Sequence, residues 1–139
     1  MQLTGRLAAR TAGVAALGLV ATLSTALPAS AANDWGVLSD LEDAKLQACK
    51  VSADGGDAWK IKLRVKNGNG YRVKSTARVF DDGTATDSRW ASGWVRRRDT
   101  SPVGSVKMGR GATWTVSFSL SADQFGGGGE RGSDSINRC

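Results

Sequence analysis

Two neighbouring stretches of the chain carry cationic side chains at alternate positions, with Thr76 as the one neutral residue in the series: Lys60, Lys62, Arg64, Lys66, Arg72, Lys74 and Arg78. No acidic residue interrupts either stretch. Ammonium and guanidinium groups arranged in rows attract polyanions, so the pattern predicts a site for an anionic polymer or surface, such as a cell-wall polymer or an acidic polysaccharide. The alternative is a solvated face that stays charged to prevent edge pairing and aggregation.

Histidine is absent from the sequence, which restricts the catalytic chemistry that the chain can support. Without imidazole it cannot form Ser-His or Cys-His nucleophiles or the usual catalytic zinc sites. The carboxylates that could in principle form a pair for glycoside hydrolysis all lie in turn-like sequences, where Asp is favoured for local hydrogen bonds. They are Asp54, Asp57, Asp81, Asp82 and Asp99. We therefore expect a protein that is not an enzyme and uses no cofactor or metal.

Two tryptophans suggest an alternative site. Trp90 and Trp94 lie four residues apart, so a strand through residues 89–97 would place both on one face. Exposed aromatic rings offer flat platforms for sugars, and this arrangement would suit a module that binds a neutral glycan. Large aromatic side chains are more often buried, as we expect for Trp59 and Trp114.

A third candidate is the arginine-rich segment that follows this strand. Arg96, Arg97 and Arg98 precede Asp99 to Pro102 in what the composition predicts to be a loop. Such a loop could serve a small secreted proteinase inhibitor directed at trypsin-like enzymes. The alternative is a solvated loop without a partner.

Nucleic acid is not the ligand we expect for the cationic stretches. Sites for single strands combine cations with stacking aromatic rings on the same face. Here the alternation places Trp59 and Tyr71 on the inner face, opposite the cations.

The elements that must position the cations are strands, because apolar and cationic residues alternate with a period of two. Between the two strands, Asn67-Gly68-Asn69-Gly70 is typical of a hairpin turn. A three-residue loop would place Lys66 opposite Arg72, Arg64 opposite Lys74 and Lys60 opposite Arg78. This register keeps every cation on one face, whereas a slip of one residue would bury cations.

About six short strands separated by turn signals predict an all-β fold, namely a small antiparallel β-sandwich, immunoglobulin-like, or a partly open barrel. Ser39-Asp40-Leu41-Glu42 matches a capping box, so we expect a short helix from Asp40 to about Gln47. A second hairpin is expected from Val103–Met108 and Ala112–Leu120. Its inner side chains would be Val106, Met108, Trp114, Val116, Phe118 and Leu120.

Cys49 and Cys139 are the two cysteines of the chain, and we expect them to form a disulfide. Neither belongs to a Cys-x-x-Cys motif, so a structural role is favoured over a redox role. Together with Cys49-Lys50-Val51 and the strand end Val65-Lys66-Asn67-Gly68, this layout resembles some bacterial cellulose-binding sandwich modules. The tryptophans do not match that family's binding positions, so the resemblance implies no site residues here.

Residues 1–31 have the features of a secretory signal peptide. Arg6 and Arg10 give a positive start, Thr11 to Leu27 is uncharged and apolar, and Ala29-Ser30-Ala31 provides a cleavage site. We expect residues 32–139 to form one secreted, extracellular domain without a transmembrane segment. Its Ala-rich leader and its Arg- and Gly-rich body are typical of GC-rich bacteria. Removing Arg6 and Arg10 leaves 17 basic residues against 13 acidic ones, so the net charge falls from +6 to +4. The sequence does not indicate an oligomeric state.

Overall fold

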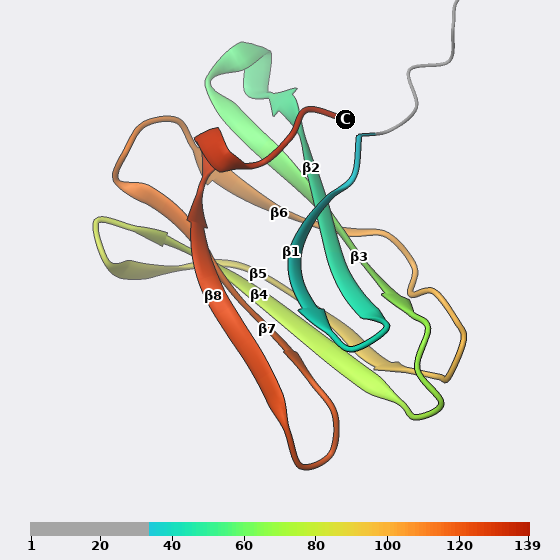
Figure 1. Cartoon of the computed structure of the whole chain (residues 1–139). Coiled ribbons are helices and arrows are strands. Elements are labelled where there is room, and N and C mark those ends of the chain that lie inside the picture. The colour runs from blue at the N-terminus through green and yellow to red at the C-terminus, as the bar shows by residue number, and fades with distance from the viewer. Residues whose placement is uncertain (1–33) are drawn as a thin grey trace, which may run out of the picture.

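Residues 34–139 are described by the computed structural model, and they form two antiparallel sheets of four strands each (Figure 1). The expected signal peptide lies outside these residues. Sheet A has the order β1-β2-β3-β6, and sheet B has the order β5-β4-β7-β8. The strands of sheet A are β1 (Gly36–Leu41), β2 (Ala44–Ala53), β3 (Ala58–Asn67) and β6 (Gly104–Gly109). Those of sheet B are β4 (Val73–Asp81), β5 (Thr84–Val95), β7 (Trp114–Ser121) and β8 (Gly126–Gly132).

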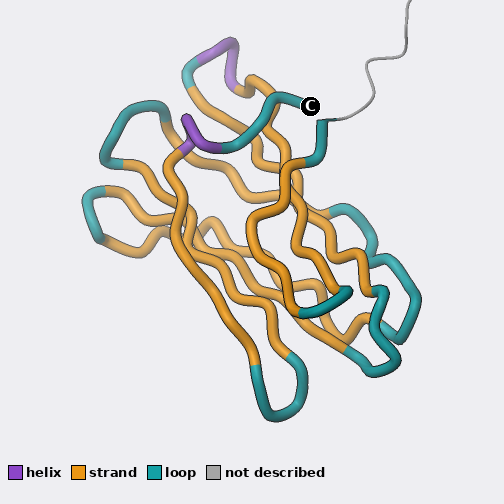
Figure 2. The backbone as a smooth tube through the Cα atoms, in the orientation of Figure 1, coloured by secondary structure: helices purple, strands orange, loops and turns teal. Residues whose placement is uncertain are grey.

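Helical structure is limited to two 3₁₀ turns within the described residues, η1 (Asp54–Gly56) and η2 (Ser133–Ser135), as Figure 2 shows. The prediction of an all-β fold is therefore confirmed. No helix in residues 34–139 is long and apolar enough to cross a membrane.

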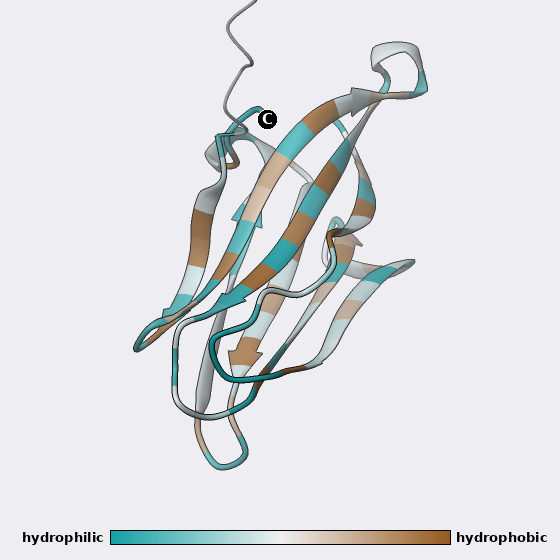
Figure 3. Cartoon of the chain, turned by 90° about the vertical axis from the view of Figure 1, so that its right-hand side faces the viewer, coloured by the Kyte–Doolittle hydropathy of each residue, from teal (hydrophilic) through white to brown (hydrophobic). Residues whose placement is uncertain are grey.

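The core lies between the two sheets. Apolar and polar residues alternate along the strands (Figure 3), and the apolar members of both sheets form one buried cluster. Ile61, Leu63 and Val65 of β3 are fully buried, as are Val73 and Val79 of β4. The inner side chains predicted for the second hairpin are also confirmed, with five buried and Trp114 packed against the cluster. The sheets therefore face each other in a sandwich-like arrangement.

The predicted hairpin of β3 and β4 is wrong, because these strands belong to different sheets. β3 lies between β2 and β6, whereas β4 lies between β5 and β7. The segment from Asn67 to Gly70 crosses from one sheet to the other. The side-chain amide of Asn67 donates to three carbonyl oxygens, including that of Val95 at 3.2 Å. Asn69 bonds in turn to Leu41 and Asp43 of the β1–β2 region. A period of two identifies the buried face of a strand but not its partner.

The second predicted hairpin is wrong for the same reason. β6 pairs with β3 in sheet A, and β7 pairs with β4 and β8 in sheet B. Gly109 is needed at the start of the crossing, since a Cβ atom there would lie 2.4 Å from the Trp114 ring.

The helix expected from Asp40 to about Gln47 is also wrong. These residues form the end of β1, a turn at Glu42 and Asp43, and the start of β2. Glu42 has a positive φ of 54°, which suits a tight turn and not a helix. The alternating burial of Ala44, Leu46 and Ala48 gives the segment an apolar face toward the core, which outweighs the local capping signal.

The predicted disulfide is present. Cys49 and Cys139 are joined with a Cα–Cα distance of 5.0 Å. β1 pairs with β2 only as far as Ala48. Beyond that point the C-terminal tail, residues 137–139, lies beside β2, and the backbone N–H of Lys50 donates to Asn137 O at 2.8 Å. The Cys139 amide donates to Lys50 O at 3.0 Å. The tail thus continues the sheet beside β2.

Candidate functional site

The outer face of sheet A carries the first group of predicted site residues. Lys60, Lys62, Arg64 and Lys66 all project from β3 away from the buried cluster, because they alternate with its buried residues. The register adds Lys45 of β2 directly opposite Lys66, and Lys107 of β6 directly opposite Lys60. We call this set the cationic face: Lys45, Lys60, Lys62, Arg64, Lys66 and Lys107.

Few of these charges are neutralised within the described residues. Lys107 forms a salt bridge with Asp54 at one end of the face. Arg64 Nε donates to the neutral Gln47 Oε1 at 2.9 Å. Asp40 lies opposite Lys45 without a salt bridge. Positive potential therefore dominates the surface along β3.

Trp35 lies on the cationic face, where no aromatic residue was expected. The guanidinium carbon of Arg64 is 4.2 Å from the centroid of its ring. The indole also borders a hollow of about 370 Å³ that Lys60, Lys62 and Ser105 line as well. This combination provides an apolar wall beside two ammonium groups.

Arg72, Lys74 and Arg78 lie elsewhere. Lys74 and Arg78 project from β4 on the outer face of sheet B, and Arg72 precedes that strand. The prediction that all seven cations share one face is therefore wrong. The error follows directly from assigning β3 and β4 to one hairpin.

Trp90 and Trp94 do not share a face, so this part of the glycan prediction is also wrong. Thr76 pairs with Ala91 but Lys74 pairs with Trp94, so β5 has one extra residue between these pairs. Gly93 absorbs this bulge with a φ of 64°. Trp90 packs toward β6, where a Cβ atom on Gly104 would lie 1.9 Å from its Nε1.

Trp94 is 42% exposed on the outer face of sheet B. Arg72 and Lys74 place their charged groups 4.3 and 4.9 Å from its ring centroid. Two cations therefore lie over the Trp94 ring, Lys74 from β4 and Arg72 from the segment just before β4.

The arginine loop is exposed and is held by β3. Arg96, Arg97 and Arg98 are all exposed, and Arg98 has a positive φ of 55°. In the residues that follow them, the backbone N–H of Asn67 donates to Asp99 O and the backbone N–H of Ser101 donates to Val65 O, each at 2.8 Å. The sequence did not indicate this support, because it comes from a strand about 35 residues earlier in the chain.

Tyr71 has the one clearly shifted pKa among the described residues. Desolvation raises the pKa of Tyr71 to about 12, together with its hydrogen bond to Glu42 and the negative charges of Glu42 and Asp43. The phenol donates to Glu42 Oε2 at 2.7 Å. The group is thus neutral at ordinary pH and has a structural role between the turn and the crossing segment.

Sequence reasoning missed Lys45, Lys107 and Trp35 on the cationic face. The alternation of Ala44, Lys45 and Leu46 contains the signal for Lys45, but the preceding capping motif favours a helix over the same residues. Lys107 alternates with Val106 and Met108, yet its position opposite Lys60 depends on strand order. Comparison with family models finds no match, and comparison with curated proteins finds none either.

Proposed function

We propose that the protein is a non-catalytic binding domain that engages an anionic polymer through the cationic face. The observation that carries this proposal is the pairing of like charges, Lys45 with Lys66 and Lys60 with Lys107, directly across neighbouring strands. Such pairs oppose folding by roughly 0.2–1 kcal/mol each, and the salt bridge of Lys107 with Asp54 offsets part of this cost in the second pair. A surface selected for stability alone would place an acidic or neutral residue in one position of each pair.

The spacing of the charges supports a linear ligand. Side chains on one face of a strand repeat about every 7 Å, so the cations from Lys60 to Lys66 span about 20 Å. A polymer with regularly spaced phosphates or carboxylates can lie along β3 and contact several of them. The hollow beside Trp35 then accepts an apolar sugar face or linker, with Lys60 and Lys62 at its rim.

We infer that the domain acts outside the cytoplasm, on a cell-wall polymer or an acidic polysaccharide. The leader-like residues 1–31 and the disulfide support this location. The scaffold we infer is immunoglobulin-like, because the chain crosses between sheets after β3, β5 and β6 in the manner of a Greek key. Nucleic acid remains a ligand to be tested, since Trp35 supplies one aromatic ring on the cationic face.

The test uses Lys60→Glu combined with Lys66→Glu. Each substitution places a carboxylate opposite a lysine, so the fold is expected to keep or slightly increase its free energy of unfolding. Binding to alginate and to inorganic polyphosphate, measured by isothermal titration calorimetry, should weaken at least about tenfold. For the wild type, raising the salt from about 50 to 200 mM should weaken binding by roughly 10²- to 10³-fold.

The matched control is Arg96→Glu combined with Arg97→Glu, which changes the net charge by the same amount in the exposed loop. It also removes two arginines on which the inhibitor alternative depends. We expect a much smaller loss of binding than in the β3 variant. Equal losses in the two variants would show that only net charge matters, and undiminished binding in the β3 variant would exclude the cationic face. Neutral dextran and single-stranded DNA serve as ligand controls.

A further inference from the structure

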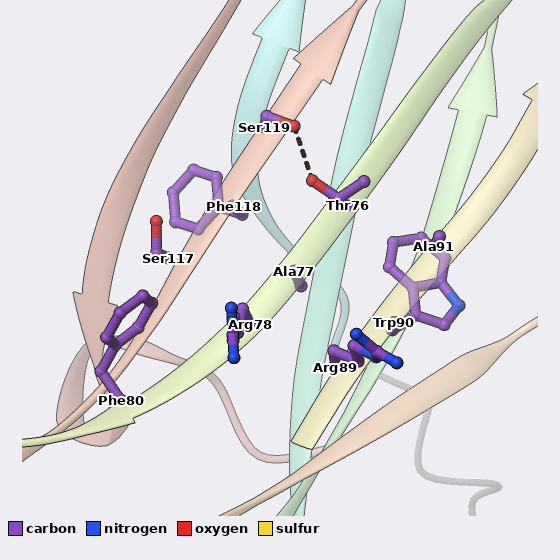
Figure 4. A pocket seen from close by; sticks show the side chains of 10 residues that line it. All are labelled: Thr76, Ala77, Arg78, Phe80, Arg89, Trp90, Ala91, Ser117, Phe118 and Ser119. Carbon is purple, nitrogen blue, oxygen red and sulfur yellow. Dashed lines mark hydrogen bonds between the residues drawn. The ribbon is translucent and has the colours of Figure 1, made fainter. Parts of the chain in front are cut away.

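The outer face of sheet B contains a larger hollow than the one beside Trp35 on the cationic face. It has a volume of about 640 Å³, within the range of small-molecule sites. The side chains that matter are Thr76, Arg78 and Phe80 of β4, Arg89 of β5, and Ser117 and Ser119 of β7 (Figure 4). The three strands are neighbours in the sheet, so these side chains lie over a continuous floor. We call this hollow the arginine pocket.

Arg78 and Arg89 lie directly opposite each other across the β4–β5 ladder, and both are exposed. Neither forms a salt bridge with a described residue. Arg78 Nε donates to Thr86 O at 3.2 Å, which leaves the other donors of its guanidinium group available. None of the described residues that line the pocket is acidic, and Glu130 of β8 shares the face but lies outside the lining. Two guanidinium groups so arranged suit a carboxylate, which accepts bidentate hydrogen bonds.

Hydroxyl groups lie next to this pair. Ser117 is opposite Arg78, and Ser119 is opposite Thr76 on the other side of β4. The hydroxyls of Thr76 and Ser119 are 2.8 Å apart and hydrogen-bond to each other, which orients both (Figure 4). Each hydroxyl can still accept or donate a further bond. Phe80 and Ala91 add apolar surface at the edges.

We propose that the arginine pocket binds a single acidic sugar of the uronate class. Such a ring combines a carboxylate for Arg78 and Arg89, hydroxyls for Thr76, Ser117 and Ser119, and apolar C–H groups for Phe80. A neutral sugar would leave the opposed arginines without a counter-charge, and a simple carboxylate would leave the hydroxyls unused. The site is separate from the cationic face, because the two lie on the outer sides of opposite sheets. The domain thus holds acidic polysaccharide on both sides.

The experiment titrates wild-type protein labelled with ¹⁵N with glucuronate, glucose and acetate, and follows the backbone amides by NMR. Glucuronate should shift the amides of residues 76–78, 89–91 and 117–119, with glucose and acetate binding at least about tenfold more weakly. Arg78→Gln combined with Arg89→Gln should weaken glucuronate binding by about tenfold or more. Thr76→Val should weaken it less, while leaving the charges in place.

Two controls separate this site from the cationic face. Arg96→Gln with Arg97→Gln removes the same charge and should leave glucuronate binding unchanged. Lys60→Glu with Lys66→Glu should also leave it unchanged while it reduces polymer binding. Acetate binding as tight as glucuronate would overturn the assignment to a sugar. Shifts confined to β3, or full binding by the double arginine variant with its native spectrum intact, would overturn the site itself.

Discussion

The outer faces of the two sheets differ in shape and in chemistry, although each is centred on a strand that alternates cations with apolar residues. β3 lies between two strands that each add a lysine, so charge spreads across sheet A. β4 lies beside the serine-bearing β7 and beside β5, so its cations border a hollow with a hydroxyl floor. The comparison teaches that the lateral neighbours of an alternating strand decide what its exposed face can bind.

The largest effect that distinguishes the two sides is expected from the disulfide, which joins the tail to sheet A alone. We expect Cys49→Ser with Cys139→Ser to lower the free energy of unfolding by about 4–5 kcal/mol, because the bond closes a long loop. Urea denaturation measures this loss. Amide hydrogen exchange should then increase in the core strands of both sheets, because amides that exchange through global unfolding lose the same free energy, and it should increase further in β2, where the tail is released. Loss of protection in β2 no greater than in β4 and β7 would contradict a local effect of the bond on sheet A.

A smaller effect is expected at the bulge that turns Trp94 outward on sheet B. Gly93→Val places a β-branched residue at a φ of 64°, so we expect a loss of about 1–2 kcal/mol in the free energy of unfolding. Gly70→Val is the control, since Gly70 has no positive φ and a Cβ atom there would meet nothing within 4 Å. Tryptophan fluorescence during urea denaturation measures the free energy of unfolding of both variants. Equal losses would show that the bulge is not the cause.

The smallest effect concerns Tyr71, which belongs to neither outer face and joins the two sheets at one end. Its phenol bonds to Glu42 of the β1–β2 turn, and its ring packs edge-on against Phe125, with centroids 5.6 Å apart. Its pKa is raised from 10.0 to about 12, chiefly by desolvation and then by Glu42. The stability it contributes is therefore complete below about pH 10 and is lost as the pH rises through about 12.

Tyr71 is the one tyrosine of the chain, so the ultraviolet absorbance of tyrosinate reports its ionisation directly. We expect a midpoint near 12 in the wild type and a lower midpoint in Glu42→Gln. A wild-type midpoint near 10 would contradict the contact with Glu42.

Burial was the part of the fold that the sequence predicted best. The alternation of Ile61, Leu63 and Val65 identified the inner face of β3 correctly, because a period of two carries that information without reference to other strands. The two cysteines allowed one pairing, and that pairing is present.

Strand partners could not be predicted in the same way. The sequence predicts Lys60 opposite Arg78, but its partners are Val51 of β2 and Lys107 of β6, and Lys107 lies nearly 50 residues later in the sequence. The Asn-Gly segment resembles a hairpin turn, yet its asparagine side chains hydrogen-bond to two other segments, the β1–β2 turn and the end of β5, that the sequence alone cannot bring together. Gly93 likewise gave no sign of the bulge that separates Trp90 from Trp94. Of the seven cations predicted to share one face, the four of β3 do so, and their role in binding stays a prediction.

The sequence separation of the two cysteines also determines when the disulfide can form during synthesis of the chain. A chain that emerges from its N-terminal end exposes Cys49 long before Cys139, which follows 90 residues later. During that interval β2 and β3 can already pair, while the edge beside Lys50 lacks the tail that later covers it. Closure of the bond is thus a late step that marks a finished domain, and an oxidant acting earlier would find a single thiol with no partner in the same chain.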